Sequence, residues 1–230
     1  MKISIAIPAY SDLDKVGASN LEVLFESISN QTHKNIEVCV SDHSSNNTYV
    51  EELCNSQDFV VKYSKYLKHY GFWAYNINNA ISMCTGDVIK FMQQDDYFLT
   101  PESLSFIASV FKDPQCVWST CGGVHTKDYV NYYHRVIPEY TEDLHHGNNK
   151  LGGVSCISVR NLESNSLFQG DLNWMGDCDY YKRMNSLYGP PAIIRESLVV
   201  YKQWPGQFTN TLGDDAKARE VDYVSKNYDN

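Results

Sequence analysis

The chain has 230 residues, of which 43% are hydrophobic, and this is enough for one sizeable core. Its formal net charge of -9 argues against nucleic acid or an anionic membrane as the main partner, although a bound metal lets an acidic protein hold a polyphosphate. None of the seven cysteines forms a Cys-x-x-Cys pair, so we expect reduced, buried thiols in a cytoplasmic protein. The chain begins with a strand-like run, and no apolar stretch approaches the length of a bilayer span. These features predict a soluble protein without a signal peptide or transmembrane segment.

Strand-like and helix-like segments alternate through the first hundred residues. The expected strands cover residues 3–7, 36–40, 59–63 and 88–92, and the expected helices cover residues 20–30, 49–54 and 73–84. Pro8 should end the first strand, because proline cannot donate a hydrogen bond to a β ladder. This alternation is typical of parallel βαβ units in an α/β fold.

Two adjacent carboxylates, Asp95 and Asp96, follow the fourth expected strand. The loops after parallel strands gather along one edge of the sheet, so Tyr10 and Asp42 should lie near this pair. Neighbouring carboxylates repel each other, and a divalent cation or hydrogen bonds would neutralise them. The structural alternative is that Asp95 caps the helix after Pro101 while Asp96 faces water.

After residue 100 the pattern changes. Short segments that contain glycine and tyrosine, at residues 116–125 and 129–137, suit antiparallel strands. Residues 139–150 are polar and predict a mobile, solvent-exposed loop, in which a metal site at His145 and His146 is the less favoured alternative. The other expected elements are a helix at 101–111, strands at 154–159 and 193–201, a short helix or turn at 161–167, a turn at 204–207 and a loosely docked helix at 214–230.

Two further acids, Asp177 and Asp179, precede a helix expected at residues 180–187. Acids at the start of a helix interact favourably with the positive end of its dipole. Helix capping alone therefore accounts for both residues as well as a catalytic role does.

Four motifs in this order and spacing make nearly the whole chain resemble the family 2 glycosyltransferases. They are residues 5–10 (Ile-Ala-Ile-Pro-Ala-Tyr), residues 27–38 with Gln31-Thr32, residues 78–89 with Asn78-Asn79 and Thr85-Gly86-Asp87, and Gly176-Asp177-Cys178-Asp179. The resemblance implies the GT-A fold, with a mostly parallel central sheet flanked by helices and a smaller antiparallel acceptor-side portion. It also implies a single domain over residues 1–230, divided into a nucleotide-sugar-binding half (1–100), an acceptor-side half (101–213) and a C-terminal tail (214–230).

The resemblance also assigns chemistry to particular residues. It implies an inverting transferase of polysaccharide biosynthesis that moves a sugar from a nucleoside diphosphate to a hydroxyl acceptor, a glycan or lipid-linked saccharide. Asp95 and Asp96 correspond to the motif that contacts the donor ribose and a Mn²⁺ or Mg²⁺ ion, with Asp96 as the direct ligand. Asp177 corresponds to the general base, and Asp179 is its competitor. The donor nucleotide is expected against Pro8, Ala9, Tyr10, Asp42, His43, Asn78 and Asp95.

The chain departs from the family pattern in three places. Gln93 stands where many relatives have the first acid of an Asp-x-Asp motif, and His43 stands where an acid typically reads the donor base. A neutral histidine accepts a base N–H through one ring nitrogen only, so UDP-, GDP- and dTDP-sugars all stay open as donors. Residues 202–207 replace a basic segment that closes over the diphosphate. Lys202 then either contacts phosphate or lies on the surface, and Trp204 either stacks on a sugar or packs the C-terminal turn.

Two other functions compete with this interpretation. A sugar-phosphate nucleotidyltransferase needs a Gly-rich loop and a lysine after the first strand, and residues 8–11 offer neither. A degenerate, non-catalytic module that binds a nucleotide sugar or glycan is favoured by Gln93 and His43 and opposed by the three retained acids. The acceptor would contact residues 124–150, and a homodimer is left open.

Overall fold

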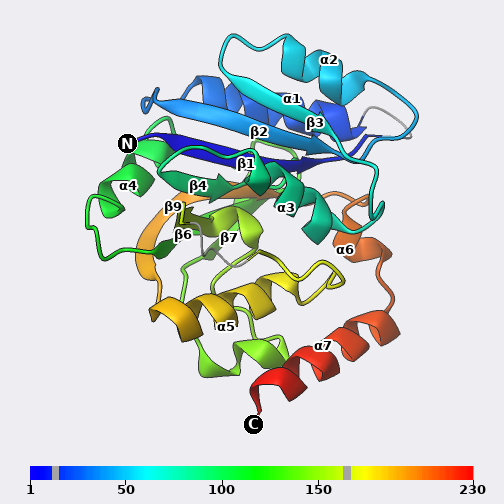
Figure 1. Ribbon diagram of the computed structural model, residues 1–230, viewed down its shortest axis with the longest axis vertical. Coiled ribbons are helices and arrows are strands. Elements are labelled where there is room, and N and C mark those ends of the chain that lie inside the picture. The colour runs from blue at the N-terminus through cyan, green and yellow to red at the C-terminus, as the bar shows by residue number, and fades with distance from the viewer. Residues whose placement is uncertain (12–15, 163–166, 230) are drawn as a thin grey trace.

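The computed structural model describes residues 1–11, 16–162 and 167–229 (Figure 1). Its first half contains the parallel strands that the alternating pattern predicted. These are β1 (Ile3–Ala9), β2 (Ile36–Asp42), β3 (Val61–Lys65) and β4 (Val88–Phe91), connected through α1 (Val16–Ser29), α2 (Tyr49–Asn55) and α3 (Trp73–Ser82). Strand β1 pairs in parallel with β2 on one side and with β4 on the other. The carboxyl ends of these three strands therefore lie at one edge of the sheet.

The prediction that Pro8 ends the first strand is wrong, because β1 continues to Ala9 and Pro8 pairs with Ser41 of β2. The reason lies in the neighbour on the other side. The ladder between β1 and β4 ends at the pair Ala6 and Phe91, so Pro8 lies beyond the point where that ladder needs an N–H donor.

The order of the strands creates a switch point at β1. The chain moves outward from β1 to β2 and β3 and then crosses back to β4 on the other side of β1. Because such crossovers are right-handed, the helices before and after the reversal cover opposite faces of the sheet. Figure 1 shows α3 in front of the strands and α1 behind them. Ligands of open α/β sheets bind beyond the carboxyl ends of the strands at such a switch point.

The second half extends the same sheet with mostly antiparallel pairs. It contains β5 (Tyr97–Phe98), α4 (Ser103–Val110), β6 (Trp118–Thr126), β7 (Tyr132–Val136), β8 (Ile157–Arg160) and β9 (Ala192–Lys202). The described strands form one sheet in the order β3-β2-β1-β4-β8-β6-β9-β5, with β7 paired to β6. The predicted antiparallel pairing of the segments around residues 120 and 134 is confirmed. The pairing of β6 with β9 is parallel.

Residues 139–150 are more ordered than we expected. They contain the 3-10 helix η1 (Glu142–His146), in which Leu144 and His145 are buried, so the prediction of a solvent-exposed loop is wrong for this turn. A second short turn, η2 (Val154–Cys156), leads into β8. Of the short helix or turn expected at 161–167, residues 163–166 lie outside the described part of the chain.

Three helices complete the chain: α5 (Gly176–Tyr188), α6 (Phe208–Thr211) and α7 (Asp214–Tyr228). Helix α5 begins earlier than predicted, so Asp177 and Asp179 lie inside its first turn. In Figure 1, α5 and α7 lie at the end of the molecule opposite to α1 and α2. Within the described ranges, no helix has the length and apolar character needed to cross a membrane.

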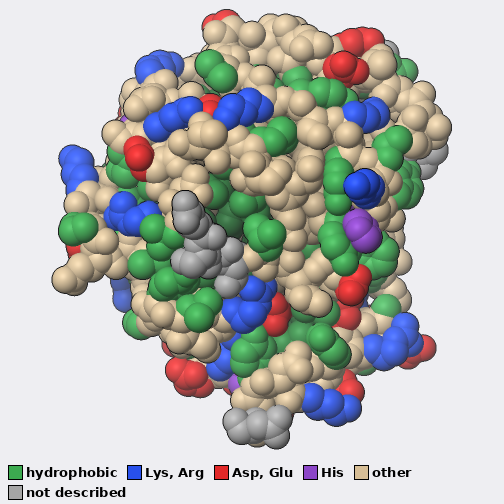
Figure 2. All heavy atoms as spheres, viewed as in Figure 1, with side chains coloured by type: hydrophobic (Ala, Val, Ile, Leu, Met, Phe, Trp, Pro, Cys, Tyr) green, Lys and Arg blue, Asp and Glu red, His purple; other side chains and the backbone are tan. Residues whose placement is uncertain are grey.

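Buried apolar side chains form one contiguous cluster that includes members of β1, α1, β6 and α5. The largest fully buried aromatic side chains are Trp118, Tyr180, Tyr181, Phe25 and Phe91. All seven cysteines are free; five of them are buried, whereas Cys84 and Cys116 are half-buried, so the expectation of buried thiols is only partly met. Figure 2 shows basic and acidic side chains interspersed with hydrophobic ones over the face that it draws.

Candidate active site

The ends of β1, β2 and β4 meet as the strand order requires. The backbone N–H of Tyr10 donates to Oε1 of Gln94 at 2.7 Å, and Nε2 of Gln94 donates to the Tyr10 carbonyl at 2.9 Å. The N–H of His43 donates to the Ala9 carbonyl at 2.9 Å. The loop after β1 is therefore attached to the loop that carries Asp95 and to the loop after β2.

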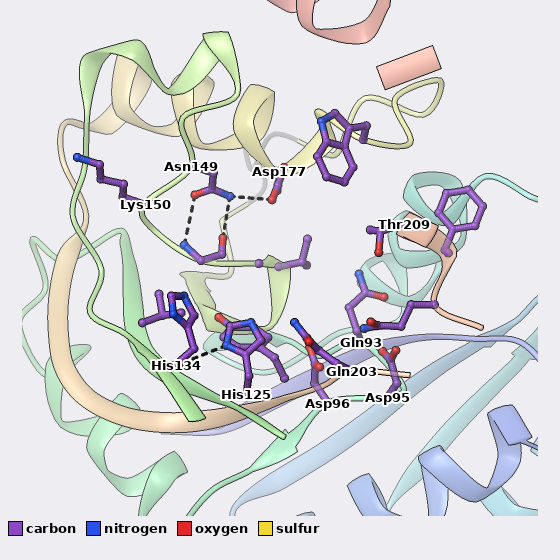
Figure 3. A pocket seen from close by; sticks show the side chains of 18 of the residues that line it. Gln93, Asp95, Asp96, His125, His134, Asn149, Lys150, Asp177, Gln203 and Thr209 are labelled. Atoms are coloured by element: carbon purple, nitrogen blue, oxygen red, sulfur yellow. Dashed lines mark hydrogen bonds between the residues drawn. The ribbon is translucent and has the colours of Figure 1, made fainter. Parts of the chain in front are cut away.

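A cavity of about 710 Å³ opens beside these ends. Figure 3 shows Asp95, Asp96 and Gln93 on one wall and Asp177 with Asn149 on the opposite wall. The hairpin of β6 and β7 supplies His125 and His134, and the segments before α5 and after β9 supply further residues. Those further residues are Asn173, Trp174, Gln203, Gln207, Phe208 and Thr209. The cavity has the size of a site for a small ligand.

Asp95 and Asp96 are held by hydrogen bonds and do not cap α4. An oxygen of Asp95 accepts from the indole N–H of Trp204 at 2.9 Å, and Oδ1 of Asp96 accepts from the N–H of Lys202 at 3.2 Å. Asp96 is only 6% exposed, and α4 has no side-chain cap. The alternative in which Asp95 caps a helix and Asp96 faces water is therefore wrong.

The chemistry of this pair fits a hard divalent cation. Burial raises the pKa of Asp95, and burial together with the neighbouring Asp95 charge raises the pKa of Asp96 well above its usual range. Carboxylate oxygens are the ligands that Mg²⁺ and Mn²⁺ prefer, and a cation between them would offset the cost of burying two carboxylates and the repulsion of Asp96 by Asp95. The two residues present are therefore suited to hold such an ion together with oxygens of a diphosphate.

Asp177 enters the cavity from the first turn of α5. A Cβ atom on Gly176 would lie 2.7 Å from the indole of Trp73, so only glycine lets α5 begin this close to α3. Oδ2 of Asp177 accepts from Nδ2 of Asn149 at 2.9 Å, and Oδ1 accepts from the N–H of Cys178 at 2.8 Å. Burial raises the pKa of Asp177 to about 6, against the lowering effect of these hydrogen bonds. A carboxylate with such a pKa is suited to remove a proton near neutral pH.

Asp179 has a different environment. It is buried, its Oδ2 accepts from Nε of Arg183 at 2.8 Å, and its Oδ1 accepts from the hydroxyl of Tyr228 at 2.9 Å. Both oxygens are thus engaged within the protein, and Asp179 is not among the residues that line the cavity. Of the two acids, only Asp177 faces the space opposite Asp95 and Asp96.

The residues that we expected to contact the donor nucleotide divide into an exposed group and a group with a structural role. Asp42 is fully buried: Oδ1 accepts from the N–H and hydroxyl of Ser44, and Oδ2 accepts from Tyr63 and from Lys65 at 2.9 Å. Asp42 therefore organises the loop after β2. Tyr10, by contrast, is 40% exposed, and its ring packs edge-on against Tyr70 with a centroid distance of 6.0 Å.

His43 is buried and stacks on Tyr66, with ring centroids 5.6 Å apart. It has a hydrogen bond to the Lys68 backbone, and its other nitrogen, Nε2, is buried without a hydrogen-bond partner. Burial lowers the pKa of His43, so the ring is neutral near pH 7. Its Nε2 therefore carries the lone pair, because the bond to a backbone carbonyl requires the proton on Nδ1.

Pro8, Ala9 and Asn78 are engaged within the protein. Pro8 and Ala9 lie inside the sheet, and the Ala9 carbonyl accepts from Nδ2 of Asn76 as well as from His43. The amide of Asn78 donates to the Phe168 carbonyl at 2.8 Å and accepts from the Phe168 N–H at 3.0 Å. These three expected residues are not among those that line the cavity, and both ends of the Asn78 amide are already bonded within the protein.

Both expectations for Lys202 are wrong. The side chain is buried, its ammonium donates to the Lys127 carbonyl, and it lies 3.9 Å from the ring centroid of Tyr129. Lys202 is therefore neither a surface lysine nor a residue that faces the cavity. Trp204 covers Gly206, where a Cβ atom would lie 2.1 Å from the indole, and it orients Asp95.

Several residues of the site carry no recognisable signal in the sequence. Asn149 reaches Asp177 from a turn in which Gly152 adopts a left-handed φ of 106°. Glu220 of α7 accepts from the N–H groups of Asn173, Trp174 and Met175, at 3.0, 2.7 and 2.9 Å. Each contact joins segments far apart in the chain, and no local motif predicts such a contact.

The described sheet, with its switch point at β1 and its flanking helices, has the GT-A fold of glycosyltransferases. The sequence model of glycosyl transferase family 2 matches residues 4–166. The chain therefore belongs to glycosyl transferase family 2. No match was found among curated protein sequences.

Solved structures of similar fold include S. aureus TarS 1-349 in complex with UDP-GlcNAc, with a TM-score of 0.73 and 15% identity over 100% of this chain and 68% of the other. The mannosyltransferase PcManGT from Pyrobaculum calidifontis, in complex with GDP-Man and Mn²⁺, has a TM-score of 0.65 and 14% identity over 90% of this chain and 58% of the other. The chain spans 43% of the longer TarS structure, at a TM-score of 0.62, 16% identity and 97% coverage of this chain. At these identities, the likeness concerns the fold.

Proposed function

We propose that this protein is a metal-dependent, inverting glycosyltransferase that moves a sugar from a nucleoside diphosphate to a hydroxyl acceptor. One observation carries the proposal: Asp177, with its pKa raised to about 6, faces the Asp95 and Asp96 pair across a single cavity. The family match and the GT-A fold support a nucleotide-sugar substrate. Two of the similar structures hold UDP-GlcNAc and GDP-Man, and these are donors of the proposed class.

In the proposed reaction, Asp177 accepts the proton of an acceptor hydroxyl. The acceptor oxygen forms a bond to the anomeric carbon while the bond from that carbon to the diphosphate oxygen breaks, and the diphosphate keeps the electron pair. Asp95 and Asp96 would hold a divalent cation, which stabilises the charge of the departing diphosphate. Attack from the face opposite the leaving group inverts the anomeric configuration. The opposite placement of Asp177 and the Asp pair in Figure 3 supports this arrangement.

Recognition of the donor base is proposed to involve the stacked pair His43 and Tyr66 together with Tyr10. The unpartnered Nε2 of neutral His43 can accept one N–H from a base, and the loop around Tyr70 would have to move to admit it. Uracil, thymine and guanine each offer a ring N–H, so UDP-, dTDP- and GDP-sugars are all suitable candidates. The exposed ring of Tyr10 can pack against the base or ribose.

The variant Asp177→Asn tests the proposed base. The amide cannot take a proton, so we expect transfer to fall by about 10²–10⁴-fold while donor binding stays near the wild-type value. Asp179→Asn is the matched control on the same helical turn and should keep transfer within about tenfold, because Asp179 acts through Arg183 and Tyr228. Transfer by Asp177→Asn at near wild-type rates would remove Asp177 from the mechanism.

A thermal-shift screen of UDP-, GDP-, dTDP- and CDP-sugars, with and without Mn²⁺, identifies the donor. A ligand that binds only the native state stabilises it by mass action and so raises the melting temperature. At 100 times its Kd, the free energy of unfolding rises by about 2.7 kcal/mol. We expect a shift that requires the metal and disappears in Asp96→Asn. Metal-dependent hydrolysis of the donor would exclude a non-catalytic binding module, whereas binding without any turnover would favour it.

A further inference from the structure

Two histidines and an aspartate meet where the C-terminal end of the chain packs against η1. His145 and His146 end η1, and Asp229 directly follows α7. Oδ1 of Asp229 lies 2.9 Å from Nε2 of His145 and 3.3 Å from Nε2 of His146. Figure 1 shows this end of α7 beside the yellow-green turn that contains η1, at the lower end of the molecule.

The hydrogen bonds of Ser225 determine which nitrogen of His146 carries its proton. The Ser225 hydroxyl donates to the His145 carbonyl at 3.1 Å, so its one hydrogen is already used. Its oxygen therefore accepts from Nδ1 of His146, 3.0 Å away, and a neutral His146 has its proton on Nδ1. The lone pair of Nε2 then faces the Asp229 carboxylate at 3.3 Å. Two acceptors this close repel each other unless a cation lies between them.

The spacing of the three ligand atoms suits a metal ion. Each residue offers one atom, and the three atoms lie within 4.8 Å of one another. A tetrahedral site with bonds of about 2.0–2.1 Å has about 3.3–3.4 Å between neighbouring ligands. The distance from Nε2 of His146 to Oδ1 of Asp229 is 3.3 Å, which equals this ligand spacing. The distance from Nε2 of His145 to the same oxygen is 2.9 Å, 0.4 Å shorter. We propose that His145, His146 and Asp229 form a zinc-class metal site that fastens the end of α7 to η1.

The ligand set defines the class of metal. Two imidazoles and one carboxylate favour borderline ions such as Zn²⁺ over Mg²⁺ and Ca²⁺, which prefer oxygen ligands only. Three protein ligands leave one tetrahedral position for water, and this position is accessible because His146 and Asp229 are about half exposed. The Ser225 contact to Nδ1 of His146 is the outer hydrogen bond that orients a metal-binding imidazole. The proposed site is independent of the transferase assignment.

The position of the site gives it a structural role. Helix α7 carries Glu220, which holds the backbone just before Asp177, and Tyr228, which bonds to Asp179. A metal at the end of α7 would keep these contacts formed. Its removal is therefore expected to loosen α7 before it affects the central sheet.

The test is a calorimetric titration of Zn²⁺ into chelator-treated protein in the presence of excess Mg²⁺. We expect one Zn²⁺ per chain, and an affinity that Asp229→Asn and His146→Gln weaken by more than about 100-fold, since loss of an outer hydrogen bond alone costs about 10–100-fold. Ser225→Ala should weaken it by about tenfold. The control variant His33→Gln, which replaces a histidine in the turn between α1 and β2, should bind Zn²⁺ as the wild type does. Co²⁺ should produce visible absorption of a tetrahedral complex in the wild type and lose it in Asp229→Asn.

Asp229→Asn and His146→Gln replace half-exposed side chains, so both variants should fold. Equal Zn²⁺ affinity in the wild type and in Asp229→Asn would overturn the proposal. The proposal would also be overturned if the wild type bound no Zn²⁺ at concentrations up to about 1 mM, roughly the weakest affinity that a specific site needs.

Discussion

Asp177 and Asp179 show how two acids on one helical turn acquire different roles. Asp179 is paired with a guanidinium and a phenol, which hold it as a fixed structural charge. Asp177 has no cationic partner among its hydrogen-bond donors, which include the Asn149 amide and the Cys178 N–H, so burial dominates and its pKa rises to about 6. At the scale of single residues, the environment and not the residue type separates the proposed base from the structural acid.

The raised pKa of Asp177 predicts an acid limb in the pH profile. A general base works only when deprotonated, so if Asp177 is the proposed base, kcat/KM should fall about tenfold per pH unit below a midpoint near pH 6 and level off above it. The profile is measured with a saturating metal concentration between about pH 4.5 and 8. Asp179→Asn should keep this limb. If the residual activity of Asp177→Asn kept it as well, the limb would belong to another group.

The sequence allowed the three acids of the proposed site to be predicted as candidates, but not their environments. The position after a strand and the family resemblance pointed to Asp95 and Asp96, the resemblance alone pointed to Asp177, and the structure brings these three to one cavity. The burial of Lys202 against Tyr129 and the internal bonding of Asp42 depend on side chains from other strands. Such contacts are set by tertiary packing, and a local pattern cannot reveal them.

Helix α7 illustrates the same limit at the scale of secondary-structure elements. Its charged sequence predicted a loosely docked helix, and Val224 is its one buried residue among those described. Yet Glu220 accepts three backbone N–H groups from the segment before α5, and Lys217 lies 4.6 Å from the ring centroid of Trp174. Hydrophobic periodicity cannot predict the docking of a helix that is held by polar contacts.

We expect Glu220 to act as a positioning residue for Asp177. Glu220→Ala leaves three N–H groups without their acceptor, which should cost about 1–2 kcal/mol of stability and lower kcat by roughly 10–100-fold, because small misplacements of a base are costly. Glu220→Gln keeps an accepting oxygen and should fall between Ala and the wild type. Kinetics and urea unfolding of the same samples provide both readouts.

Asp222→Asn is the control for this prediction on the same helix. Among the described residues, Asp222 pairs with Lys226 in an exposed i, i+4 contact, so its replacement should change stability by less than about 0.5 kcal/mol and leave kcat unchanged. If Glu220→Ala lost stability but kept the kcat of the wild type, Glu220 would be structural only. Its placement next to Trp174 in the cavity wall argues for the larger effect.

At the scale of the whole molecule, the proposed site and a stabilising charge cluster lie at opposite edges of the sheet. The first half followed from local periodicity, because each βαβ unit is contiguous in sequence. The parallel pairing of β6 with β9 joins segments about seventy residues apart and breaks its register near Gly122, so no pattern in the sequence indicated it. This pairing brings the end of β9, and with it Trp204, to Asp95.

The opposite, amino-terminal edge of the sheet contains a buried charge cluster around Glu37. Its carboxylate accepts from Lys2 at 2.6 Å, from Lys62 at 3.0 Å, from the Ser4 hydroxyl at 2.6 Å and from the Thr85 N–H at 2.6 Å. Burial alone would raise the pKa of Glu37, but these donors together lower it far below the usual range. The cluster therefore ties the starts of β1, β2 and β4 together at the edge away from the proposed site.

This cluster predicts a loss of stability that leaves catalysis intact. Because the pKa of Glu37 is lower in the folded than in the unfolded chain, its contribution is fully present above the ordinary value of 4.5 and is lost as the pH falls below it. Glu37→Gln should cost about 2 kcal/mol at pH 7, or roughly 4–8 °C in Tm. The difference from the wild type should shrink steadily below about pH 4.5. Because the proposed site lies at the other edge, kcat at 25 °C should be unchanged, and a fall in kcat would show that the two edges are coupled.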